Sequence, residues 1–163
     1  MFETQFTQPN VELWQQLLSH RQKFLTQSGD RLSILKEALH NPSERVTALQ
    51  LCLYLTEAER QTLFDELVRL ASVGHSDIEL VRQTILSLPH SWLSTHIEAV
   101  AESLLEEGTD EEYRRLLELY INIDNHLAKR LIKRALQHQD PEIQEVGEDF
   151  EKHYNFNAQD GKY

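Results

Sequence analysis

The sequence predicts an all-α fold in which pairs of antiparallel helices repeat along the chain, an α-solenoid of about four pairs. Gly and Pro are scarce, with five and four among 163 residues, so few residues interrupt a helix. Apolar residues recur at the spacing of a helical face. The joins between the expected helices also recur at nearly constant intervals, which is typical of a helical repeat.

The segment from 127 to 141 shows one helix and the start of the next. An apolar stripe at helical period consists of Leu127, Ala128, Leu131, Ile132, Ala135 and Leu136. The other side of the same helix is basic and carries Lys129, Arg130, Lys133 and Arg134. Asp140 and Pro141 then predict an N-cap followed by proline at the first position of a new helix.

Similar signals predict nine helices. Seven are expected over about residues 10–27, 31–40, 42–55, 58–72, 77–88, 92–107 and 125–138, and two more begin at Thr109 or Asp110 and at Asp140. Expected N-caps are Asn10, Asn41, Ser91 and Asp124, and Thr56 with Glu59 forms a possible capping box. The apolar side of the first helix is expected to contain Trp14, Leu17, Leu18, Phe24 and Leu25.

The joins repeat with a period near 33 residues. Second helices of the pairs end at Leu39, Leu70, Leu104 and Leu136, and the helices that follow begin at Asn41, Ser76, Thr109 and Asp140. One pair cannot bury its apolar face alone, so neighbouring pairs must stack. An irregular helical bundle is the alternative, and the even spacing of four joins favours the solenoid.

The predicted organisation is a loose arm over 1–9, a single helical-repeat domain over 10–154 and a frayed tail over 155–163. Cys52 is the only cysteine, so an internal disulfide and a cysteine-based zinc site are not expected, and its apolar surroundings predict burial. The first residues lack the apolar segment of a signal peptide, and no stretch suits a bilayer span. We therefore expect a cytoplasmic protein with no membrane insertion.

The net charge is −11, from 27 acidic and 16 basic residues. Residues 41–108 alone contribute −7. Nucleic-acid binding is not expected, because phosphates require a positive surface.

No nucleotide-binding, metalloprotease or nucleophile-elbow motif occurs. We expect no enzymatic activity and no catalytic, cofactor or metal site. The residues around His75 are interpreted as cap and turn residues, and Glu98 and Glu102 as solvated acids at helix ends or exposed turns.

Two segments, HNPSERVTALQLCLYL and HQDPEIQEVGEDF, resemble first helices of HEAT-like repeats. The matching residues are Asn41, Pro42, Val46 and Ala48 in one segment and Asp140, Pro141, Val146 and Gly147 in the other. The two middle copies lack the proline. The short period is similar to that of the HEAT-like family that includes phycobilisome bilin lyases. This HEAT/ARM-like resemblance implies a scaffold that binds another macromolecule, with the second helices lining its concave side.

The basic face of residues 125–138 is the first candidate contact site. Lys129 with Lys133, and Arg130 with Arg134, are like charges at i,i+4 and repel each other. Acids could offset this repulsion within the chain, and the candidates are Glu118, Asp124, Glu145 and Glu148. Alternatively, the offset comes from an acidic partner.

Trp92, with His96 beside it, is the second candidate. Trp92 either packs onto the core or forms an exposed binding anchor. We therefore expect a non-enzymatic protein–protein interaction module (an adaptor, chaperone or assembly factor) that binds a protein partner through Trp92, His96 and the four basic residues. Two alternatives remain: an accessory subunit of a phycobilin lyase, and an acidic inhibitor or immunity-type protein that caps a basic partner with residues 41–108.

Overall fold

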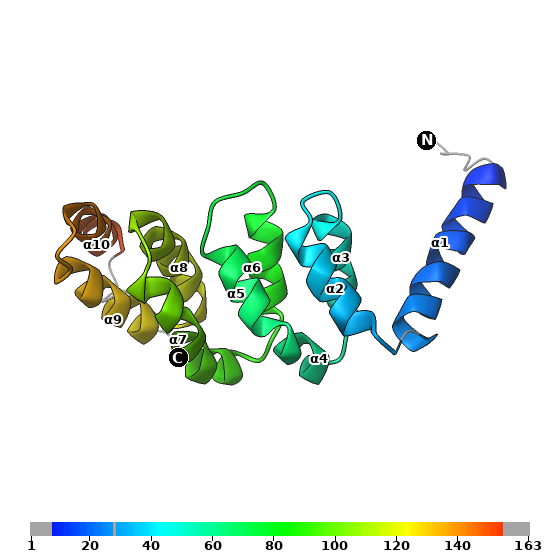
Figure 1. Cartoon of the computed structure of the whole chain (residues 1–163), viewed down its shortest axis with the longest axis horizontal. Helices are drawn as coiled ribbons and strands as arrows, with labels where there is room; N and C mark the ends of the chain where they lie inside the picture. Colours follow the sequence, from blue (N-terminus) through cyan, green and yellow to red (C-terminus); the bar gives the residue numbers. More distant parts are fainter. Residues whose placement is uncertain (1–7, 28, 155–163) are drawn as a thin grey trace, which may run out of the picture. The chain divides into compact units, whose positions relative to one another are not determined.

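The computed structural model of the chain describes residues 8–27 and 29–154. This part of the chain contains ten α-helices and no β-strand (Figure 1). The predicted all-α class is therefore confirmed for these residues. Most of the predicted arm and the predicted tail (residues 1–7 and 155–163) lie outside the described residues.

The helices group into two compact units, unit 1 over Met1–Thr56 and unit 2 over Glu57–Tyr163. Unit 1 contains α1 (Gln8–Gln27), α2 (Arg31–His40) and α3 (Arg45–Cys52). Unit 2 contains α4 (Glu57–Thr62), α5 (Phe64–Ala71), α6 (Ile78–Leu86), α7 (His90–Glu106), α8 (Asp110–Ile123), α9 (Asn125–Leu136) and α10 (Pro141–His153).

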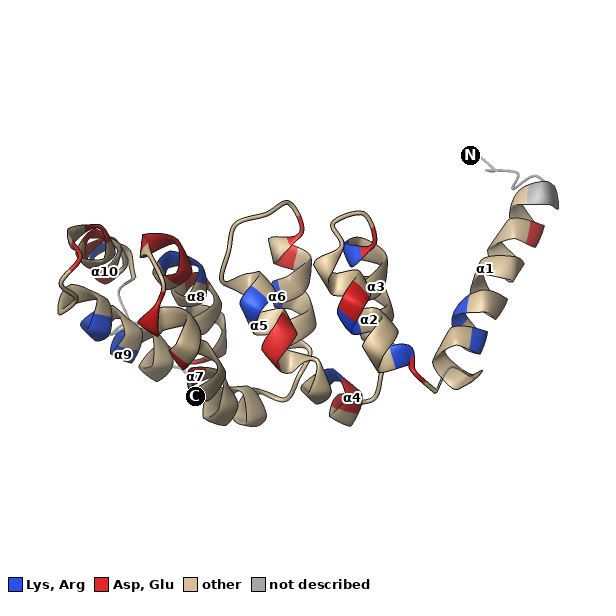
Figure 2. Ribbon diagram, in the orientation of Figure 1, with Lys and Arg blue, Asp and Glu red and all other residues tan. Residues whose placement is uncertain are grey.

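The two units differ in charge. Unit 1 has five acidic and five basic residues, so its formal charge is zero. Unit 2 has 22 acidic and 11 basic residues and therefore carries the whole net charge of −11. Acidic positions on α8 and α10 are visible in Figure 2.

In unit 1, α2 and α3 pack against each other and form a small apolar core. Its buried members include Leu35, Leu39, Ala48, Leu49 and Cys52. The predicted burial of Cys52 is confirmed.

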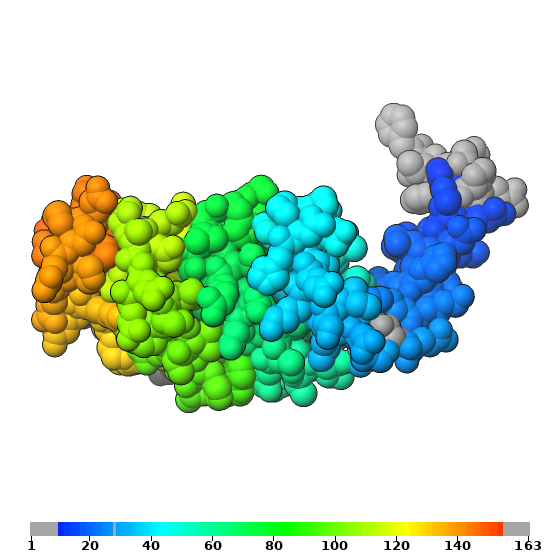
Figure 3. All heavy atoms as spheres, in the orientation of Figure 1, coloured from blue at the N-terminus to red at the C-terminus, as the bar shows by residue number. Residues whose placement is uncertain are grey.

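The first helix begins at Gln8, two residues before the predicted cap Asn10. Trp14 and Leu17 belong to the predicted apolar side and are 57% and 59% exposed, so this side is not covered at these two residues. An amphipathic stripe identifies the apolar side of a helix but not whether another element covers it. In Figure 3 the N-terminal turns of α1 stand clear of α2 and α3.

Unit 2 is organised around α8. This helix packs against α5, α6, α7, α9 and α10. Its buried side chains form one broad face, and they are Tyr113, Leu116, Leu117, Leu119, Tyr120 and Ile123. Because α7 and α9 both pack against α8, this helix brings the two close together.

Three predicted helix starts are confirmed by their caps. Thr109 forms a capping box with Glu112 at the start of α8. The side chain of Asp124 accepts a hydrogen bond from the backbone N–H of His126 (2.6 Å) at the start of α9. The side chain of Asp140 accepts one from Glu142 (2.9 Å), with proline at the start of α10.

Two predicted caps are wrong. Asn41 Oδ1 accepts hydrogen bonds from the backbone N–H and the hydroxyl of Ser43 (3.1 and 2.9 Å), so it closes a turn and α3 begins only at Arg45. Ser91 lies inside α7, because the carbonyl of Pro89 already accepts from residues 92 and 93.

The predicted helix over 58–72 is two helices. The backbone N–H of Leu63 bonds the carbonyl of Arg60, three residues back (3.1 Å), and this tighter turn separates α4 from α5. Both Leu63 and Phe64 are buried at the break.

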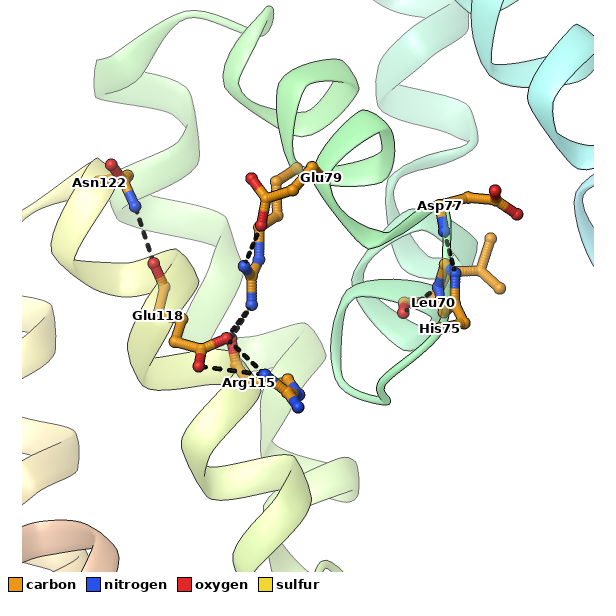
Figure 4. A network of polar contacts seen from close by, with 8 residues as sticks. Leu70, His75, Asp77, Glu79, Arg115, Glu118 and Asn122 are labelled. Carbon is orange, nitrogen blue, oxygen red and sulfur yellow. Dashed lines mark hydrogen bonds and ion pairs between the residues drawn. The ribbon is translucent and has the colours of Figure 1, made fainter.

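A polar network joins α6 to α8 (Figure 4). Arg82, whose side chain is only 11% exposed, donates to Glu79 (2.6 Å) and to Glu118. Arg115 also donates to Glu118, at 3.1 Å to each carboxylate oxygen. Asn122 donates to the backbone carbonyl of Glu118 at 2.8 Å. Glu118 thus pairs with arginines of α6 and α8, not with the basic residues of α9.

The contact between α9 and α10 depends on Gly147. A Cβ atom added at this buried position would lie 2.9 Å from the backbone nitrogen of Leu136 and 3.1 Å from Cβ of Ala135. The glycine at position 147 therefore permits a close approach of two helices.

We predict that Gly147→Ala lowers the free energy of unfolding by about 1–3 kcal/mol, because the added methyl group must displace backbone of α9. Urea denaturation followed by circular dichroism measures the change. Gly29→Ala is the matched control, since nothing lies within 4 Å of a Cβ there. Equal stability of Gly147→Ala and the wild type would contradict the close approach.

Candidate functional site

Two ion pairs join α7 to α9 across the surface of unit 2. Arg130 donates from Nε and Nη2 to the two carboxylate oxygens of Glu98, at 2.9 Å each. One helical turn further on, Arg134 donates to Glu102 at 2.8 Å. The i,i+4 spacing places both acids on one face of α7 and both arginines on the facing side of α9.

These contacts identify the acids that offset the two arginines. An offset within the chain is confirmed for the two arginines. Glu98 and Glu102 supply most of it, and they lie within α7. The charge of Asp124, one of the predicted acids, adds to it at Arg130. The hydrogen bonds that the arginines donate to these carboxylates raise the pKa of Arg130 and of Arg134 above the ordinary value. All four side chains are at least one-third exposed, so the pairs fix geometry more than they add stability.

A small cleft lies between the two ion pairs. It has a volume of about 100 Å³ and is lined by Leu105, Leu131 and Tyr120 as well as by the paired residues. Tyr120 comes from α8, is 1% exposed, and its hydroxyl has no hydrogen-bond partner. The cleft therefore combines a buried phenol with paired charges of both signs.

Burial raises the pKa of Tyr120, and the nearby carboxylates of Glu98 and Glu102 raise it further. The charges of Arg134 and Arg130 act in the opposite direction. The phenol therefore stays neutral and can both donate and accept a hydrogen bond.

No motif in the sequence predicts this cleft. Glu98 and Arg130, and likewise Glu102 and Arg134, are 32 residues apart, close to the period of the joins. Comparing residues one such interval apart would have suggested these pairs.

Lys129 and Lys133 lie on another side of α9. They line a groove of about 280 Å³ together with Ile132, Leu136 and Glu151 of α10. The four basic residues predicted as one face are thus divided: the arginines face α7 and the lysines face α10.

Trp92 and His96 lie together on α7 and stack with ring centroids 4.2 Å apart. Trp92 also meets buried Phe64 edge to face, at 4.9 Å. Trp92 is half-buried and His96 is exposed. The indole therefore packs against the core on one side, and part of it stays accessible to solvent. Trp92 thus has features of both predicted roles, core packing and an exposed binding anchor.

The remaining candidates for chemistry occupy structural positions. The ring of His75 accepts from the backbone N–H of Asp77 (3.1 Å) and reaches the carbonyl of Leu70 (3.0 Å), as expected of a turn residue. Among the described residues no group of three or more His, Cys, Asp or Glu side chains could hold a metal ion. Nor does any helix in this part of the chain have the length and apolar character needed to cross a membrane.

No family model, curated protein or solved structure matches the chain.

We predict that Tyr120→Phe flattens the fall in stability at alkaline pH. The unfolded chain releases this proton near the ordinary pKa of 10.0, whereas the folded chain retains it. The wild type therefore loses stability as the pH rises above 10, and the variant lacks this contribution. Urea unfolding from about pH 9 to about pH 11 measures the two slopes. Parallel slopes would contradict burial of the phenol.

Proposed function

We propose that unit 2 is a HEAT-like α-solenoid. Polar contacts between helices two apart in the chain support this proposal. The pairs between α7 and α9 span 32 residues, and Arg114 of α8 reaches Asp149 of α10 (3.1 Å) across 35 residues. Arg82 of α6 reaches Glu118 of α8 across 36 residues. Recurring contacts at such separations are typical of stacked repeats.

We further propose that the chain is a non-enzymatic protein–protein interaction module, an adaptor, chaperone or assembly factor of the cytoplasm, and that it binds its partner through the α7–α9 surface. We define this surface as Trp92, His96, Glu98, Glu102 and the four basic residues of α9. The observation that carries the proposal is the double ion pair between α7 and α9, which orders the surface before any partner arrives. A surface that is already ordered loses less conformational entropy when a partner binds.

The two margins of this surface suggest how a partner is held. The half-exposed indole of Trp92 offers an apolar anchor, and Trp is enriched among binding hot spots. Lys129 and Lys133 offer positive charge, so the favoured partner carries carboxylates opposite them. Complementary charges of this kind raise the association rate and the specificity of binding.

One observation favours a second candidate. Unit 2 carries the whole net charge of −11, and exposed acids such as Glu106 and Glu107 follow the end of α7. In this case the acidic residues of unit 2 would cap a basic partner, as an inhibitor or immunity-type protein does.

We predict that the double variant Lys129→Glu, Lys133→Glu loses a partner that the wild type captures stoichiometrically from cytosol. The reversed charges repel the partner's carboxylates, while the ion pairs between α7 and α9 remain. Affinity capture at low and moderate salt, followed by mass spectrometry, measures this. The matched control Lys23→Glu, Lys36→Glu makes the same charge change in unit 1 and should retain the partner.

Retention of the partner by the α9 double variant would exclude the lysines as its contact. If capture is then lost in Glu106→Lys, Glu107→Lys instead, the acidic inhibitor is the better description.

A further inference from the structure

The N-terminal part of α1 presents an apolar surface that no described element of unit 1 covers. Leu13, Trp14 and Leu17 are 63%, 57% and 59% exposed, and Val11 is 41% exposed. Single exposed apolar residues are ordinary, whereas a contiguous group on one helix marks an interaction site. The spacing i, i+3 places Trp14 and Leu17 on neighbouring turns of the same face.

A hollow lies beside this face. Arg21 of α1 donates to the hydroxyl of Tyr54 (2.8 Å), and its guanidinium lies 4.2 Å from the centre of the Tyr54 ring. These contacts hold the C-terminal half of α1 against the end of α3. Next to them is a cavity of about 390 Å³, lined largely by Leu17, Leu51, Leu53 and Tyr54. Leu53 and Tyr54 are themselves 45% and 56% exposed.

Charge indicates what covers this surface. Unit 1 has a formal charge of zero, whereas unit 2 carries −11. Two copies of the chain can therefore meet through unit 1 without net repulsion there, but contacts through unit 2 would bring like charges together. A strongly charged partner would gain little attraction at unit 1.

We propose that unit 1 is a self-association surface, in which two copies pack about a two-fold axis and each inserts Trp14 into the hollow between α1 and α3 of the other. A two-fold contact requires a projecting group and a receiving hollow on the same surface, and unit 1 has both. The exposed indole is the anchor of the contact, and Leu13 and Leu17 enlarge the apolar area around it. This proposal is independent of partner binding by the α7–α9 surface.

The test uses the fact that the full chain has only two tryptophans. In the Trp92→Phe variant, Trp14 is the sole source of indole fluorescence. We expect a dimer by sedimentation velocity and a blue-shifted emission at high concentration. Dilution across roughly two decades around micromolar should produce monomer and a red shift with one shared midpoint.

Leu17→Glu in the same background should weaken the dimer by at least about tenfold, because it places a carboxylate in the contact. Gln16→Glu is the matched control: it adds the same charge to an exposed position beside the stripe and should leave the midpoint unchanged. Circular dichroism verifies that both variants keep their helical content.

A monomer at every concentration overturns the proposal. So does a blue-shifted Trp14 in a monomer, which would mean that the chain covers its own indole. Equal weakening by Leu17→Glu and Gln16→Glu would also overturn it, because charge rather than the apolar face would then control association.

Discussion

The burial of α8 is the constraint on which the arrangement of unit 2 depends, because this helix contacts five other helices at once. Each of its leucines removed from water contributes about 1.5–3 kcal/mol, and two tyrosines add large apolar areas. A helix that packs against five others restricts where its neighbours can lie, and α7 and α9 both lie against it. The surface shared by α7 and α9 is thus a consequence of how α8 is buried.

Polar contacts then set the register of the helices that apolar packing brings together. The pairs from Glu98 to Arg130 and from Glu102 to Arg134 are largely exposed, so their contribution to stability is small. Their directional hydrogen bonds nevertheless fix which turns of α7 and α9 face each other. Arg82 and Glu118 have a similar role between α6 and α8, in a more buried position.

Local signals in the sequence predicted the helices well, since a cap such as Asp140 needs only a backbone N–H two residues away. Contacts between residues far apart in the sequence were harder to predict. The amphipathic stripe of the first helix identified Trp14 as apolar, but its exposure depends on what α2 and α3 leave uncovered. The pairing of Arg130 with Glu98 depends on how α7 and α9 pack against α8. The division of α9 into an arginine side and a lysine side follows from the positions of α7 and α10.

Hydrogen exchange of the purified chain, followed by mass spectrometry, tests the central role of α8 most directly. If α8 holds unit 2 together, its amides exchange only through global unfolding and are the slowest in the chain. The amides of α7 and α9 should open more readily, and those in the N-terminal turns of α1 more readily still. Exchange in α8 as fast as in α1 would contradict the account, because α7 and α9 would then lack a common support.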